Sequence, residues 1–351
     1  MVLRKTTPHA VKNNSLITDN HSYSVSAYPD YEQKYLTRFN SFFNNEKLSS
    51  TYKPVFLKSL LDISDYDGSN RLTGSNCIEK NGEQLRIDLN FIAIRYIKYY
   101  WEFLFKFKLK QSHSPLDANI NTILRNVNKE PKSPSLEILA TEEFQKLRKE
   151  VINRSIKPEV LIHLDPVGDL YRRNESNNSI TIDKSLIDFF KNHRGILLSA
   201  LNFMITRYLE KINFVPRIAE KVTGSIPRTH LNNKEKTILL ELHDSCFYCK
   251  NKSDKGYHMD HVIPFNYLYQ TEIFNIVPAC NTCNSSKNDR LPTPEIFNKV
   301  ISRNNKLNLR KDYTDEWYRK LYDTCLESYH GSRPIFDSHK SEVEGLGGKF
   351  S

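Results

Sequence analysis

Apolar residues recur three and four positions apart along most of the chain, which is the pattern of amphipathic helices. In the stretch that starts at Tyr31, for example, Tyr35, Phe39 and Phe42 fall on one predicted face. Helices are predicted over residues 31–43, 54–62, 91–107, 120–124, 141–153, 182–192, 196–212 and 234–242. Apolar and polar residues alternate over 84–89, 169–172 and 179–182, which predicts three short strands, the last two forming a hairpin.

Changes in composition along the chain predict four parts. Residues 1–28 are polar and lack periodicity, so they are predicted to form a flexible N-terminal arm. Residues 29–232 are predicted to be a mostly helical domain that recognises a target or a partner. Residues 233–300 contain four of the six cysteines and are predicted to be a separate small module, and residues 301–351 a C-terminal helical extension with a loose tail.

The charge balance favours a polyanionic partner without proving one. The 351 residues include 51 Lys and Arg against 41 Asp and Glu, a formal net charge of +10. Each phosphate that a basic side chain neutralises releases a condensed counterion, so a basic protein gains affinity for nucleic acid. A lysine-rich solvated surface explains the same numbers, because net charge reports on association rather than on fold.

The hydrophobic segments do not predict a membrane protein. The most apolar stretch, Phe91–Phe107, carries Arg95, Lys98, Glu102 and Lys106 and is too charged to span a bilayer. The first residues, MVLRKTTPHAVKNN, are not followed by the apolar segment of a secretory signal. We therefore expect a soluble cytoplasmic protein with no membrane partner.

Four cysteines form two CxxC pairs, Cys246–Cys249 and Cys280–Cys283, whereas Cys77 and Cys325 stand alone. Disulfides are rare in a reducing cytoplasm, and two CxxC pairs at this spacing are typical of a tetrathiolate Zn²⁺ site. We expect this Zn²⁺ to be structural, since a module of this size has too small a core to be stable alone.

The most informative stretch, residues 246–292, reads CFYCKNKSDKGYHMDHVIPFNYLYQTEIFNIVPACNTCNSSKNDRLP. It resembles the HNH nucleases, also called ββα-metal or His-Me finger nucleases. The elements that carry the resemblance, in order, are the first cysteine pair, Asp260–His261 with Val-Ile-Pro264, Asn275, the second cysteine pair, and Asn284-Ser-Ser-Lys287. A zinc ribbon without nuclease function would have no reason to contain this Asp–His pair and these two asparagines.

The resemblance implies a role for each matching residue. Asp260 and Asn284 would bind a catalytic Mg²⁺ or Mn²⁺, His261 would activate water, and Asn275 would orient the histidine. Elementary chemistry agrees, because oxygen ligands suit a hard cation and imidazole titrates near neutral pH. The implied fold is a strand over 257–261, a second strand over 276–279 and a helix from Asn281.

Three further residues are candidates for accessory roles. His258 lies two positions before Asp260 and is either a further metal or phosphate ligand or an ordinary surface histidine. Lys287 and Arg290 begin a basic run that extends to Lys311 and is predicted to follow the DNA backbone, the alternative being a merely solvated face.

The combined prediction is a mainly α protein with a small α+β module. A helical N-terminal region is followed by a zinc-stapled ββα-metal HNH domain and a C-terminal helical extension. The expected activity is metal-dependent DNA cleavage by a one-metal mechanism, in restriction or anti-phage defence. The alternatives are a homing nuclease of a mobile element and a non-catalytic zinc module that binds nucleic acid or a protein. DNA is the expected partner, with a second copy of the chain or a partner defence protein as further options.

Overall fold

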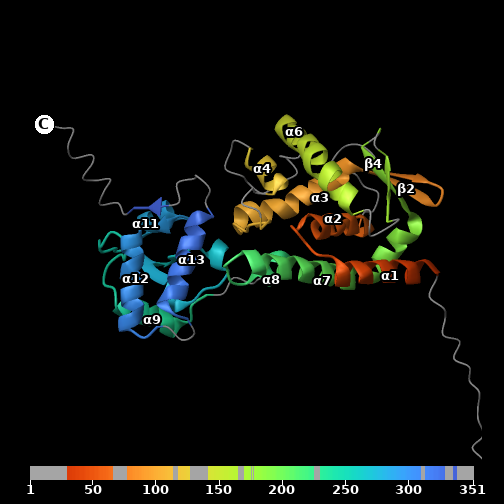
Figure 1. Ribbon diagram of the computed structural model, residues 1–351. Helices are drawn as coiled ribbons and strands as arrows, with labels where there is room; N and C mark the ends of the chain where they lie inside the picture. The colour runs from red at the N-terminus through yellow and green to blue at the C-terminus, as the bar shows by residue number, and fades with distance from the viewer. Residues whose placement is uncertain are drawn as a thin grey trace, which may run out of the picture.

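The protein has two lobes, which Figure 1 shows side by side. The computed structural model describes residues 30–65, 77–113, 118–126, 141–164, 170–174, 176, 178–224, 230–309, 313–328 and 335–337. We call residues 30–224 the N-terminal lobe and residues 230–337 the C-terminal lobe. The predicted arm at 1–28 lies outside the described residues.

The N-terminal lobe is mostly helical. Its helices are α1 (Asp30–Asn45), α2 (Tyr52–Leu61), η1 (Asp62–Asp65), α3 (Leu89–Trp101), η2 (Glu102–Lys106), α4 (Asn119–Arg125), α6 (Glu142–Val151), η3 (Ile152–Leu161), α7 (Lys184–Ile212) and α8 (Ile218–Thr223). The helix α2 packs against both α3 and α7 and is buried along almost its whole length. Aromatic residues fill the contact between α1 and α7, where the rings of Phe39 and Phe189 stack at 5.8 Å. This lobe therefore has a large core of its own.

A four-stranded antiparallel sheet lies at one end of this lobe, in the order β1-β2-β4-β3. The strands are β1 (Ile78–Asn81), β2 (Gln84–Asp88), β3 (Arg172–Asn174) and β4 (Ser179–Asp183). Ile87 faces Ile180 across the central pair, and both are fully buried. The strands predicted near 84–89 and 179–182 are thus present, but β1 was not predicted, because its sequence IEKN is mostly exposed and has no apolar alternation.

The two helices predicted over 182–192 and 196–212 are one continuous helix, α7, of 29 residues. Gly195 lies at the expected break, on the exposed side of the helix. One glycine in a helix interior costs about 1 kcal/mol relative to alanine. The buried residues on either side, Phe190 and Leu197 among them, outweigh that cost by anchoring both halves to one core.

The C-terminal lobe is smaller and contains the cysteine pairs. Its elements are α9 (Asn233–Glu241), β5 (His258–His261), α10 (Phe265–Leu268), η6 (Ile273–Asn275), β6 (Ile276–Ala279), α11 (Asn281–Lys287), β7 (Leu291–Pro292), α12 (Pro294–Lys306), α13 (Asp315–Glu327) and β8 (Ile335–Phe336). Asn232 and Glu235 form a capping box at the start of α9, and Thr293 and Thr314 cap α12 and α13. Short polar segments therefore set where these helices begin.

One hydrophobic core joins the cysteine region to the last helices. Cys246 and Val277 share it with Val300, Leu321 and Phe336. The helix α12 continues across residue 300, so no break in structure separates the cysteine module from the helices that follow. The domain limits drawn from the sequence stay predictions, and the predicted loose tail falls largely on residues outside the described ones.

The chain is thus mostly helical with one small ββα unit, as predicted for the fold class. Among the described residues, no helix is both long enough and apolar enough to cross a membrane.

Candidate active site

The ββα unit forms from a strand pair and the helix that follows it. The strand β5 pairs antiparallel with β6, so that Asp260 lies opposite Val277 and His261 opposite Ile276. The Sγ of Cys280 accepts a bond from the backbone N–H of Cys283 at the start of α11. The predicted strands over 257–261 and 276–279 and the helix from Asn281 are confirmed.

The four cysteines of the two CxxC pairs come together in one cluster. Their sulfur atoms all lie within 4.8 Å of one another, with 3.9 Å between those of Cys249 and Cys280. A tetrahedral Zn²⁺ with Zn–S bonds of about 2.3 Å needs sulfur atoms about 3.8 Å apart. Burial raises the pKa of Cys246, but backbone donors from Cys280, Cys249 and Tyr248 more than offset this and leave it below its ordinary value. The cluster fits a structural zinc.

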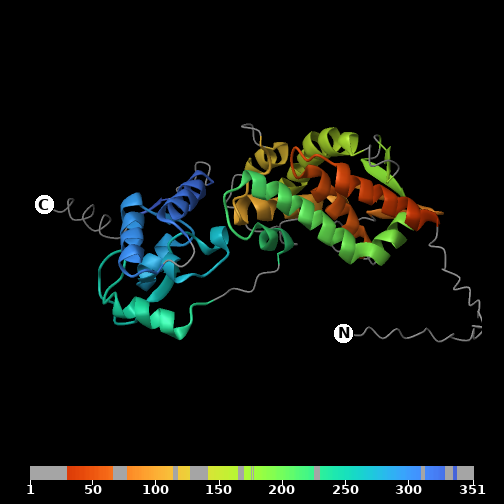
Figure 2. The ribbon, with the colours of Figure 1, turned by 60° about the horizontal axis from the view of Figure 1, so that its bottom comes forward.

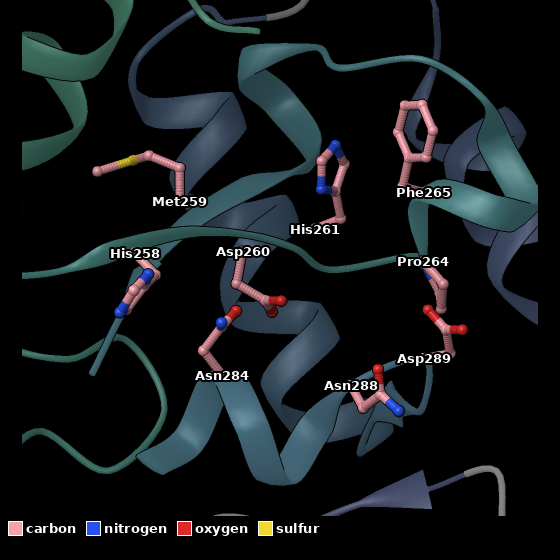
Figure 3. A pocket seen from close by; sticks show the side chains of 9 residues that line it. All are labelled: His258, Met259, Asp260, His261, Pro264, Phe265, Asn284, Asn288 and Asp289. Atoms are coloured by element: carbon pink, nitrogen blue, oxygen red, sulfur yellow. The ribbon is translucent and has the colours of Figure 1, made fainter. Parts of the chain in front are cut away.

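A cleft of about 290 Å³ opens between the hairpin and α11. Figure 3 shows the side chains that line it, among them His258, Asp260, His261 and Asn284. Asp260 and Asn284 point toward each other (Figure 3). The imidazole of His261 lies on the other side of the strand, beside Phe265. The structure thus gathers Asp260, Asn284 and His261 at one cleft, where the side chains of Asp260 and Asn284 point toward each other.

Buried donors hold Asp260 in place, and its side chain is only 9% exposed. The hydroxyl of Tyr248 donates to its Oδ2 at 2.5 Å, and the ammonium of Lys287 lies 3.2 Å from the same atom. Burial raises the pKa of the Asp260 carboxyl, and the charge of Lys287 and the bond from Tyr248 offset only part of this rise, so that the pKa stays above its ordinary value. Tyr248 and Lys287 both contact Oδ2, and a backbone hydrogen bond from His261 to the carboxylate also lowers the pKa.

The His261 ring has two neighbours from the segment that follows it. Its Nε2 lies 3.1 Å from the Oγ1 of Thr271, within hydrogen-bond distance. The ring of Phe265 packs edge-on against it, with 5.4 Å between the centroids. The orientation of the imidazole therefore depends on residues 265–271.

Asn275 is fully buried and ties the loop after His261 to the second strand. Its side chain donates to the carbonyl of Ile263 and accepts from the N–H of the same residue, both at 2.9 Å. The hydroxyl of Tyr318, from α13, donates to the same Asn275 Oδ1 at 2.7 Å. Asn275 thus fixes the backbone two residues beyond His261.

Arg303, from α12, supports the same region. Its guanidinium is almost fully buried and donates to the carbonyls of Ile276, at 2.7 Å, and Phe274, at 3.0 Å. Burial lowers the pKa of Arg303 to about 10. Sequence reasoning counted Arg303 in the basic run predicted to follow the DNA backbone, where its burial does not fit, and it missed Tyr318 and Tyr248 as site residues. Arg303 and Tyr318 lie outside the HNH motif. The motif assigns no role to Tyr248, which lies between Cys246 and Cys249.

The predicted accessory residues differ in their placement. His258 is exposed at the edge of the cleft. Lys287 was expected to follow the DNA backbone, but it is fully buried and donates to the carbonyl of His261 at 2.6 Å. Its side chain folds back under the hairpin because the Asp260 carboxylate attracts it there. A surface contact with DNA does not fit this position.

The rest of the basic run is divided between structure and surface. Arg290 is half-buried, donates to the carbonyl of Ser286 and lies over the ring of Phe336. Lys299 pairs with Glu295, and Lys306 is exposed. Residues 310–312 lie outside the described part of the chain. A role in DNA contact stays a prediction for Arg290.

The donor set in the cleft fits a hard divalent cation. Asp260 offers a carboxylate oxygen and Asn284 an amide oxygen, and Figure 3 shows the two side chains converging. Mg²⁺ is commonly bound by one or two protein oxygens and keeps several waters. The four cysteine sulfur atoms form a separate cluster, which differs chemically from this pair of oxygen donors.

Two family models match parts of the chain. Residues 246–290 match the family described as HNH endonuclease, and residues 32–160 match a family described as Domain of unknown function (DUF8808). The chain therefore carries an HNH endonuclease domain in its C-terminal lobe. No curated protein and no solved structure was found to match it.

Proposed function

We propose that this chain is a metal-dependent DNA endonuclease that uses a one-metal HNH mechanism. The observation that carries the proposal is the gathering of Asp260, Asn284 and His261 at one cleft within the matched HNH region. The zinc-type cysteine cluster and Asn275 behind the cleft support it, because they hold strand, loop and helix in a fixed relation.

In the proposed reaction, the chain's residues act from two sides of the cleft. Asp260 and Asn284 would hold Mg²⁺, and the ion, when bound, would supply positive charge to the phosphate oxygens. With its Nε2–H donated to Thr271, His261 takes a proton from the attacking water at Nδ1. The water oxygen forms a bond to phosphorus, one P–O ester bond breaks, and the leaving oxygen gains a proton from solvent. Asn275 keeps the loop, and with it the imidazole, in place.

For the biological role, we propose restriction or anti-phage defence rather than mobile-element homing. The large N-terminal lobe supports this, since it is unlike a minimal nuclease followed by small DNA-binding repeats. The lobe would then recognise the target or a partner protein, or join two copies of the chain. Phage plating on cells that express the chain or its His261→Ala variant tests this role, and equal plating on both would count against it.

The activity itself is tested by nicking of supercoiled plasmid with Mg²⁺ or Mn²⁺. We expect the native chain to cut and His261→Ala to cut at least about a hundred-fold more slowly, the usual size of general-base catalysis. His163→Ala, which removes an exposed histidine of the N-terminal lobe, is the matched control and should cut normally. Equal cleavage by the native chain and His261→Ala would remove His261 as the base.

A further inference from the structure

The short helix α10 follows the Asp260–His261 pair directly and is held by the N-terminal lobe. Lys221, from α8, donates through Nζ to the carbonyl of Tyr267 and, at 2.8 Å, to that of Pro216. The hydroxyl of Tyr267 reaches back to the carbonyl of Phe214, at 3.5 Å. Figures 1 and 2 both show α8 and the end of α3 beside the C-terminal lobe. The loop that follows the site is therefore fixed to the other lobe.

Three aromatic contacts lead from the N-terminal core to His261. The ring of Phe107 packs edge-on against Tyr269, with centroids 5.1 Å apart. Tyr269 stacks on Phe265 at 5.3 Å, and Phe265 contacts the His261 ring at 5.4 Å. We call Phe107, Tyr269 and Phe265 the aromatic ladder. Tyr269 belongs to the hydrophobic core of the N-terminal lobe although its place in the sequence is in the HNH region.

The backbone of Tyr269 is held in an unfavourable conformation. Its φ is +61° and its ψ is +30°, in the left-handed region that a bulky side chain rarely adopts. Such a conformation is energetically unfavourable and persists only where the surroundings determine it. The burial of the Tyr269 ring between Phe107 and Phe265 is the surrounding packing that does so here.

Two contacts of the His261 ring come from this anchored segment. Phe265 packs on the ring, and Thr271, two residues after Tyr269, lies at hydrogen-bond distance from its Nε2. The Asp260 side chain, by contrast, lies on the other side of the strand, where Tyr248 and Lys287 hold it. The side chains of Asp260 and His261 thus have different neighbours, although Lys287 also donates to the backbone carbonyl of His261.

We propose that the N-terminal lobe sets the orientation of the His261 imidazole through the aromatic ladder, so that Phe107 and Tyr269 are positioning residues for catalysis. The expected change in kcat rests on the proposed nuclease function. The expected effect on the orientation of the His261 ring does not. It assigns the N-terminal lobe a direct part in the active site. A change in how the lobes pack would then change the catalytic rate without altering any residue that touches DNA.

The test compares three variants of the full zinc-loaded chain. Tyr269→Leu removes the ring but keeps an apolar side chain, and Tyr269→Phe keeps the ring. Phe214→Leu is the matched control, because it removes another aromatic contact between the lobes, to Trp317 at 6.4 Å, that does not lead to His261. The readouts are kcat and KM for plasmid nicking and the ring-proton NMR shifts of His261, identified by their absence from His261→Ala.

We expect Tyr269→Leu to lower kcat by roughly ten- to a hundred-fold, with KM within about two-fold, because a small misplacement of a catalytic group has that effect. The His261 resonances should move, since the ring of Phe265 no longer keeps its place. Tyr269→Phe and Phe214→Leu should keep the native kcat and resonances. If Tyr269→Leu does not fold, Phe107→Leu at the other end of the ladder should give the same signature.

An unchanged kcat and unmoved His261 resonances in Tyr269→Leu would overturn the proposal. So would an equal loss of kcat in Phe214→Leu, which would make lobe contact in general, and not the ladder, the cause. If the native chain cuts no DNA, the proposed function fails by itself. The NMR comparison then decides the ladder alone, with unmoved resonances counting against it.

Discussion

The two lobes differ in how their structure relates to their sequence. In the C-terminal lobe, the candidate chemistry lies within residues 246–290, where short spacings define it. In the N-terminal lobe, a large apolar core determines the fold, and its helices α7 and α8 fall outside both matched families. Yet the two meet at Tyr269 and Lys221. The comparison teaches that the reactive groups are specified locally, whereas their placement depends on residues far away in the chain.

The largest expected effect tests whether the two lobes are stabilised in different ways, one by zinc and the other by a large hydrophobic core. Cys280→Ser should lose zinc and unfold the ββα unit, because zinc binding in such small modules contributes about 10–16 kcal/mol. The N-terminal lobe should stay folded on its own core. Zinc analysis and protease digestion of the variant measure both. A zinc-free variant with an intact C-terminal lobe would show that this lobe does not depend on the metal.

The next largest effect is a difference in stability between variants of the two proposed oxygen ligands, Asp260 and Asn284. Asp260→Ala should destabilise the C-terminal lobe by about 3–5 kcal/mol, since it leaves the buried Lys287 ammonium without its negatively charged partner. Asn284→Ala removes a half-exposed side chain and should leave stability nearly unchanged. Both should abolish cleavage. Urea unfolding of the two variants measures the difference. Equal stabilities would mean that the ion pair of Asp260 with Lys287 contributes little to the free energy of unfolding.

The contact between the lobes should depend on pH through Lys221. Burial lowers its pKa to about 7, so between pH 7 and the ordinary lysine value near 10.4 the unfolded chain holds a proton that the folded chain lacks. The free energy of unfolding therefore increases with pH between these two values, by up to about 1.4 kcal/mol per pH unit. Lys221→Met should flatten the rise of the melting temperature between pH 7 and 9.5. The same slope in both proteins would show that Lys221 is charged in the folded state.

The smallest effect tests whether α13 supports the site. Tyr318→Phe removes one bond to Asn275 and should cost about 1 kcal/mol of stability together with a measurable loss of cleavage rate. Tyr322→Phe, from the same helix, loses a bond to the carbonyl of Pro292 and is the control. It should match the stability loss but cut normally. If both variants cut at the same rate, the hydroxyl of Tyr318 has no part in positioning the loop.

The sequence indicated the candidate reactive groups of the site, whose roles stay predictions, but it did not indicate the residues that support them. Asp260, His261 and Asn284 could be assigned because their spacing within the cysteine pairs is characteristic of one kind of site. Arg303 and Phe107 could not, because an arginine on a helix or a phenylalanine in a core carries no chemical signature until the fold brings it to the site. Lys287 was placed on the surface because a helix position alone does not show that a buried carboxylate draws its side chain inward.

The fold was predicted where periodicity was strong and missed where tertiary packing decided. The helices α1 and α9 and the strands β5 and β6 lie where predicted. The single helix α7 was split at Gly195, because local propensity does not register that both halves pack on one core. The strand β1 was missed because it is an exposed strand at the edge of the sheet, where pairing with β2 replaces an apolar pattern.

The central claim is that Asp260, Asn284 and His261 serve one site, and Mn²⁺ tests it most directly. In the zinc-loaded chain, Mn²⁺ bound by the oxygen pair should broaden the ring-proton NMR signals of His261, because the three side chains line the same cleft. Asn284→Ala should abolish that broadening while it keeps its zinc. If Mn²⁺ binds but leaves the His261 signals sharp, or broadens them equally in Asn284→Ala, the three residues do not form one site.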